Sequence, residues 1–98
     1  MIISEFLTAL RKINNKDTLL IPAHTREANR CINIVGYTKY AVELDSTAHS
    51  IDYYDVRKLV KRLLNLSPNK VVRIYMLGTI VEVERVFEEG DYTILDCM

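Results

Sequence analysis

The segment Ser50–Leu66, SIDYYDVRKLVKRLLNL, has the clearest helical pattern in the chain and lies between two blocks of predicted strands. Its apolar residues recur at i, i+3, i+4, i+7 and i+8, which is the spacing of one helix face. These residues are Val56, Leu59, Val60, Leu63 and Leu64. Asp52 suits the N-cap position, and Pro68 stops the helix because proline disfavours helix in the residue before it. We predict an amphipathic helix over residues 52–66.

The other face of this helix carries four cations within six residues and no acid; they are Arg57, Lys58, Lys61 and Arg62. Lys70 and Arg73 extend the run, so that residues 57–73 hold six cations and no acid. Such a face suits the phosphates of a nucleic acid or the carboxylates of a protein partner. It is also the ordinary solvated face of an amphipathic helix.

The chain before this helix predicts one more helix and three strands. Apolar residues at helical spacing indicate the helix over residues 4–13. The strands are expected over residues 18–21, 31–35 and 40–45. Pro22 ends the first strand or places it at a sheet edge. Residues 36–39 are expected to form a hairpin loop, and alternation in the third strand turns Tyr40 inward.

The chain after the helix predicts three strands, over residues 70–77, 80–87 and 92–97. The first of these is apolar on both faces, so we expect either cover from a second layer or pairing in a homodimer. In the strand over residues 80–87, the alternation of polar and apolar residues indicates that Glu82 and Glu84 face solvent. Residues 88–91 are expected to form the turn before the last strand.

These elements predict one α+β domain over residues 1–98, in the order α-βββ-α-βββ. We expect one antiparallel sheet, or two, packed against two amphipathic helices. A chain of 98 residues with 49% hydrophobic content is long enough to bury a single core.

Thirteen basic and thirteen acidic residues cancel, so the net charge gives no argument for binding to nucleic acid or to a membrane. The charge is nevertheless sorted along the chain. Residues 82–96 hold six acidic residues and one basic residue, Arg85. Residues 57–73 hold basic residues and no acidic ones. A bipolar surface of this kind suits a charged partner or head-to-tail self-association.

The residues that usually carry catalysis or bind metals are few. His24, His49, Cys31 and Cys97 are the only histidines and cysteines, and none shows the close pairing of a zinc site. A hydrolase using Cys31 and His24 lacks a group to orient the imidazole. The three glycines do not form a phosphate-binding loop. We therefore predict no enzyme activity, no cofactor and no metal.

The compartment is expected to be the cytoplasm. The first residues, MIISEF, lack the basic start of a signal peptide, and no uncharged apolar run approaches the roughly 18 residues of a membrane helix. We accordingly expect no membrane partner.

The function that we predict is a small non-enzymatic binding protein, a regulator or inhibitor that captures a protein partner. Its size and its frequent Asn, Ile, Lys and Tyr suit a protein encoded by a bacterial phage or mobile element. The binding residues would come from the basic helix face, the polar loop over residues 24–30 and the basic run that follows the helix. They are Arg57, Lys58, Lys61, Arg62, Arg26, Arg30, Lys70 and Arg73. A homodimer would form through strand 71–77.

The alternative is a nucleic-acid-binding domain that uses the basic face of helix 52–66. Six tyrosines could add stacking surfaces for bases; they are Tyr37, Tyr40, Tyr53, Tyr54, Tyr75 and Tyr92.

Overall fold

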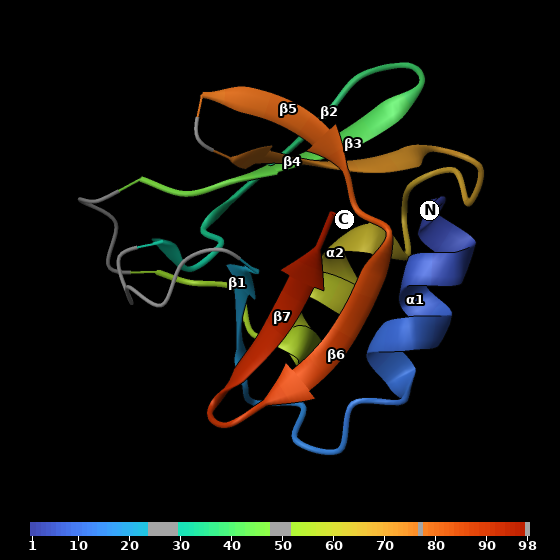
Figure 1. Ribbon diagram of the computed structural model, residues 1–98. Coiled ribbons are helices and arrows are strands. Elements are labelled where there is room, and N and C mark those ends of the chain that lie inside the picture. Colours follow the sequence, from blue (N-terminus) through green and yellow to red (C-terminus); the bar gives the residue numbers. More distant parts are fainter. Residues whose placement is uncertain (24–29, 48–51, 77, 98) are drawn as a thin grey trace.

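A computed structural model describes residues 1–23, 30–47, 52–76 and 78–97 (Figure 1). Along these residues the chain forms two helices and seven strands. In order they are α1 (Ile3–Arg11), β1 (Leu19–Pro22), β2 (Ile34–Tyr37), β3 (Ala41–Asp45), α2 (Val56–Leu63), β4 (Val71–Met76), β5 (Thr79–Glu82), β6 (Arg85–Glu89) and β7 (Tyr92–Asp96). None of the described helices is long and apolar enough to cross a membrane.

The strands form two sheets, one with the order β1-β7-β6 and one with the order β2-β3-β4-β5. The α+β class with two packed helices is confirmed, but the expectation of purely antiparallel sheets is wrong. β1 runs parallel to β7, and β3 runs parallel to β4. The second parallel pair follows from the connection, because α2 carries the chain back before β4 begins.

The core lies between the two sheets and receives both helices (Figure 1). α1 contributes Phe6 and Leu10, which are fully buried. α2 contributes Val56, Leu59 and Leu63, also fully buried. Burying each of these side chains stabilises the fold by about 1.5–3 kcal/mol. The four-stranded sheet therefore has a core-facing inner side and an outer side that no described helix covers.

The helix predicted over residues 52–66 is α2, but it is shorter, because it begins at Val56 and ends at Leu63. Its N-cap is Asp55 rather than Asp52, because the Asp55 side chain accepts a hydrogen bond from the backbone N–H of Lys58 at 2.7 Å. Asp55 also forms a β-bridge with Leu19, which holds its backbone extended. A contact distant in sequence thus sets where the helix starts.

The strand predicted over residues 31–35 is β2, displaced towards the C-terminus. Cys31 and Ile32 are buried but belong to no strand. The Ile32 N–H donates to the carbonyl oxygen of Leu20 in β1. The hairpin loop is also shorter than residues 36–39, because Tyr37 still pairs with Val42. Tyr40, expected to face inward, is exposed in the tight turn that results.

The single strand predicted over residues 80–87 is two strands in different sheets, β5 and β6. The chain crosses between the sheets at Val83 and Glu84. The Val83 N–H donates to the carbonyl oxygen of Val72 in β4, which belongs to the four-stranded sheet. The Glu84 N–H donates to the carbonyl oxygen of Asp96 in β7, which belongs to the three-stranded sheet. Alternation continues through this crossing, so the sequence pattern contains no break. The expected turn over residues 88–91 is correspondingly shorter, because β6 continues to Glu89.

β4, the strand predicted over residues 70–77, lies inside its sheet. β3 pairs with one edge of it and β5 with the other. A homodimer therefore cannot form by edge pairing through this strand. The dimer remains a prediction, and it would need a different surface.

Candidate cationic groove on α2

A groove of about 500 Å³ lies against the exposed face of α2. Its described lining comes from α2 and the residues just after it, from the segment before α2, and from one residue preceding β2. The lining residues are Lys58, Lys61, Arg62, Asn65, Asp52, Tyr53, Tyr54 and Asn33. We call this the cationic groove, because three of the four basic residues predicted on the helix face form one of its walls.

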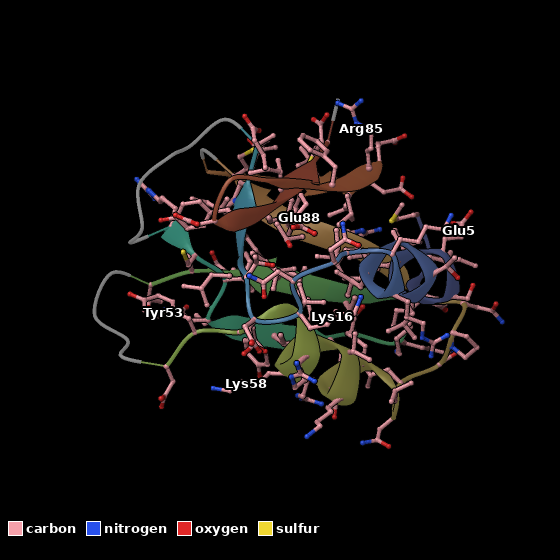
Figure 2. All side chains as sticks on the ribbon, turned by 90° about the horizontal axis from the view of Figure 1, so that it is seen from below. Glu5, Lys16, Tyr53, Lys58, Arg85 and Glu88 are labelled. Carbon is pink, nitrogen blue, oxygen red and sulfur yellow. The ribbon has the colours of Figure 1, made fainter. Side chains whose placement is uncertain are left out.

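The cations reach the groove because of helical periodicity. Val56, Leu59 and Leu63 point into the core, so Lys58, Lys61 and Arg62 point the opposite way. Figure 2 shows Lys58 extending away from the body of the molecule on the outer side of α2, with Tyr53 on the segment that leads to the helix.

The groove cations differ from Arg57 in their ion pairing. Arg57 contacts Asp17 at 3.5 Å, with both side chains exposed, and it does not line the groove. Among the described residues, no carboxylate lies within 4 Å of Lys58, Lys61 or Arg62. These three side chains keep their charge available to a ligand.

A second feature adjoins the groove at Arg62. Its guanidinium lies 5.6 Å from the centre of the Tyr37 ring, and the Lys70 ammonium lies 5.8 Å from the same ring. Lys70 also donates to the carbonyl oxygens of Thr38 and Lys39, so it closes the β2–β3 turn. The exposed Tyr37 therefore sits between two cations and continues the basic surface beyond the groove.

The walls of the groove are held by hydrogen bonds. The Asn33 side chain donates to the Thr47 carbonyl and accepts from the Thr47 N–H, both at 2.9 Å. Tyr54 donates its N–H to the Ile32 carbonyl. Because the Asn33 amide is already engaged, we assign ligand contacts to the cations and to the tyrosine rings rather than to this residue.

The other predicted binding residues do not join this surface. Arg73 lies on the outer side of β4, whereas α2 packs against the inner side of that sheet. Arg30 is exposed in the turn before Cys31 and does not line the groove. Arg26 lies outside the described residues, as do His24 and His49. The groove thus unites Lys58, Lys61 and Arg62, with Lys70 connected only through Tyr37.

Charge order predicted the cations of the groove, but the six tyrosines had no pattern that distinguished those near it from the others. Three of them, Tyr37, Tyr53 and Tyr54, lie at the groove or beside it. The adjacency of Tyr53 and Tyr54 to the helix start was the available signal for two of these. Tyr37 could not be found, because only the pairing of β2 with β3 brings it near Arg62.

Two of the acids in residues 82–96 make internal contacts. Glu82 accepts a hydrogen bond from the Met1 amino group at 2.8 Å, and this contact lowers the pKa of that carboxyl. Glu88 accepts from the backbone N–H of Asn14 at 2.7 Å, which ties β6 to the loop after α1. Figure 2 shows Glu88 directed towards this loop. These two carboxylates thus connect segments that lie far apart in the sequence.

The thiols are placed poorly for nucleophilic chemistry. Cys31 is buried, and burial raises the pKa of its thiol. Burial also raises the pKa of Cys97, to about 11. A cysteine nucleophile requires the opposite shift, because the thiolate is the reactive form.

Metal ligands do not converge in the part of the chain that the structure describes, where no three His, Cys, Asp or Glu side chains form a candidate metal site. Comparisons with known protein families, curated proteins and solved structures found no match. The chemistry of the groove itself is therefore the basis for a functional proposal. It offers positive charge, aromatic rings and hydrogen-bond donors.

Proposed function

We propose that this chain is a small non-enzymatic binding protein, a regulator or inhibitor that captures a protein partner through the cationic groove. The observation that carries the proposal is the wall formed by Lys58, Lys61 and Arg62, three cations without a carboxylate partner among the described residues. An acidic segment of the partner would supply the missing carboxylates. Size and composition support an inhibitor encoded by a phage or mobile element.

Three carboxylates near the start of α2 favour an acidic protein segment over a nucleic acid. Asp55 caps the helix, Asp17 pairs with Arg57, and Asp52 lines the groove. A phosphate backbone running along the helix would pass these carboxylates and be repelled. A peptide needs to place only one or two carboxylates between Lys58 and Arg62. The groove volume suits a few side chains of that kind.

The second candidate, a nucleic-acid-binding surface, is favoured by Tyr37. From Arg62 the basic surface continues past this ring to Lys70, with Lys39 beside the exposed ring of Tyr40, 5.5 Å from its centre. Alternating cations and aromatic rings are the features that bind single strands by phosphate contact and base stacking. On this route a strand would avoid the acids at the start of α2.

Charge reversal tests the proposal. We would measure binding of a fluorescent peptide that carries two adjacent glutamates among neutral residues to the full chain at low salt, and repeat it with Lys58→Glu plus Lys61→Glu. The expected result is micromolar binding that the double variant weakens at least tenfold. Arg11→Glu plus Lys12→Glu is the matched control, because both side chains are exposed on α1 and the net charge changes equally. Equal weakening by both pairs would refute a specific groove.

Labelled single- and double-stranded DNA and RNA, titrated across a salt series, separate the two candidates. Nucleic-acid binding that falls steeply with salt and is lost in Tyr37→Ala would establish the second candidate. Binding of the peptide alone, insensitive to Tyr37→Ala, would support the first. If neither ligand binds at low salt, both proposals for this surface are wrong.

A further inference from the structure

The outer side of the four-stranded sheet is free of other described elements. Both helices and the three-stranded sheet lie on its inner side (Figure 1). Six large hydrophobic side chains are exposed among the described residues, and three of them lie on this outer side. They are Ile34, Tyr75 and Ile80, with exposed fractions of 39%, 41% and 42%. The strand register explains why they form one patch.

The register aligns the outward-facing residues in two rows across β2, β3, β4 and β5. One row is charged and contains Gly36, Glu43, Arg73 and Glu82. The other contains the three hydrophobic residues and one acid, in the order Ile34, Asp45, Tyr75 and Ile80. We call these eight residues the sheet face. Its two halves differ in charge, because β2–β3 contributes Glu43 and Asp45 whereas β4–β5 contributes Arg73 and Glu82.

The charges of the sheet face are partly engaged within the chain. The Tyr75 hydroxyl donates to Glu43 at 3.0 Å, and Glu82 accepts from the Met1 amino group. Arg73 stands between these two acids in its row, yet no described carboxylate lies within 4 Å of its guanidinium. Arg73 is therefore an exposed cation in an acidic row, available to a carboxylate from another molecule.

We propose that the sheet face binds the sheet face of a second copy of this chain. The twofold axis would run along the strands, between β3 and β4. This rotation places β4 of one copy over β3 of the other, and β5 over β2. Arg73 then comes opposite Glu43 of the second copy, and Ile34 comes opposite Ile80. Each contact occurs twice, because an interface of this symmetry is isologous.

Two opposed pairs remain. Glu82 comes opposite Gly36, which has no side chain to compete for the space, and Tyr75 comes opposite Asp45. Two sheets packed in this way lie about 10 Å apart with their strands within about 30° of each other, so the opposed rows stay in register near the axis. The dimer leaves the cationic groove free, because α2 lies on the inner side of the sheet. The inference is thus independent of the proposed ligand.

The size of the sheet face sets the expected affinity. Four strands about 4.8 Å apart and about five residues long cover roughly 300 Å² in projection. Even with the relief of the side chains, this is smaller than the roughly 800 Å² per partner of a standard interface. Interfaces of this size are typical of weak, transient association, so the dimer is expected to dissociate on dilution.

Sedimentation velocity of the full chain, from about 1 μM to 1 mM, tests the proposal. The wild-type chain is expected to change from monomer to dimer across this range. Arg73→Glu and Glu43→Arg should each raise the dissociation constant at least tenfold, because symmetry makes each change disrupt two ion pairs. The two changes together restore opposite charges at every pair and should recover dimerisation. Recovery would also show that the single variants failed through charge and not through misfolding.

Two further variants distinguish a sheet-face dimer from association through another surface. Ile80→Lys should weaken the dimer as well, because it places a charge opposite Ile34. Lys61→Glu should have no effect. A chain that stays monomeric at 1 mM would overturn the proposal, as would a double charge exchange that fails to restore the dimer. A dimer disrupted by Lys61→Glu would overturn it too, because the association would then be head-to-tail between the basic and acidic surfaces.

Discussion

The N-cap of α2 gives the sharpest prediction about how the fold is specified. Asp55→Ala removes the oxygen that accepts the Lys58 N–H at 2.7 Å, while the Asp55 carbonyl still accepts from Leu59. Loss of a cap of this type costs about 1 kcal/mol, within a range of about 0.5–2. Loss of a negative charge at the helix N-terminus adds about 0.3–1 kcal/mol. The expected total is about 1–2 kcal/mol of unfolding free energy.

Urea unfolding measured by circular dichroism would detect this change. With a slope of about 1–3 kcal/mol per molar urea, a loss of about 1–2 kcal/mol should lower the midpoint by about 0.3–2 M. The matching fall in melting temperature is about 4–8 °C per kcal/mol for a domain of this size. Asp55→Asn is the control, because it keeps an acceptor oxygen and should lose only the charge contribution.

Two results would refute the reasoning. The first is an Asp55→Ala midpoint within about 0.1 M of the wild type. The second is a larger loss from Asp52→Ala than from Asp55→Ala, which would mean that the helix starts where the sequence pattern placed it. The outcome matters for the cationic groove as well, since the first turn of α2 positions Lys58.

Three other predictions concern the core, a buried hydrogen bond and a thiol. Leu59→Ala should cost about 2–5 kcal/mol of unfolding free energy, because Leu59 is fully buried, whereas Leu64→Ala at a 56% exposed position should cost less than about 0.5 kcal/mol in the same urea titration. Thr18 donates its one hydroxyl proton to a backbone carbonyl, so the 2.7 Å contact with Thr93 requires Thr93 to donate. Thr93→Val should therefore cost about 1 kcal/mol, and a double-mutant cycle with Thr18→Val should show coupling; strict additivity would contradict the bond. The pKa of Cys97 is raised from 9.0 to about 11 in the folded chain, so stability should hold below pH 9 and fall as the pH rises towards 11. Cys97→Ala should remove part of that fall, and an unchanged pH profile would count against the shift.

Helices were predicted well because their signal is local. Ile3, Phe6 and Leu10 recur at helical spacing, and the structure buries all three in α1. The same argument placed Lys58 and Lys61 on the exposed side of α2. Each of these conclusions needs only residues within a few turns of one another.

The errors arose where distant segments set the geometry. Asp55, not Asp52, caps α2, because Asp55 is held by a β-bridge to Leu19. Residues 80–87 read as one alternating strand, yet the chain changes sheets at Val83 because Val72 accepts its N–H. No window around either site contains the partner that decides the outcome.

The candidate sites divide in the same way. The amphipathic helices, the α+β class and the cations of α2 follow from the amino-acid sequence, because periodicity and charge order are properties of a continuous segment. The position of Tyr37 between Arg62 and Lys70, and of Arg73 on the sheet face instead of in the groove, depends on the three-dimensional fold. The physical reason is that strand pairing joins residues far apart in the chain, and each register then selects which side chains share a surface.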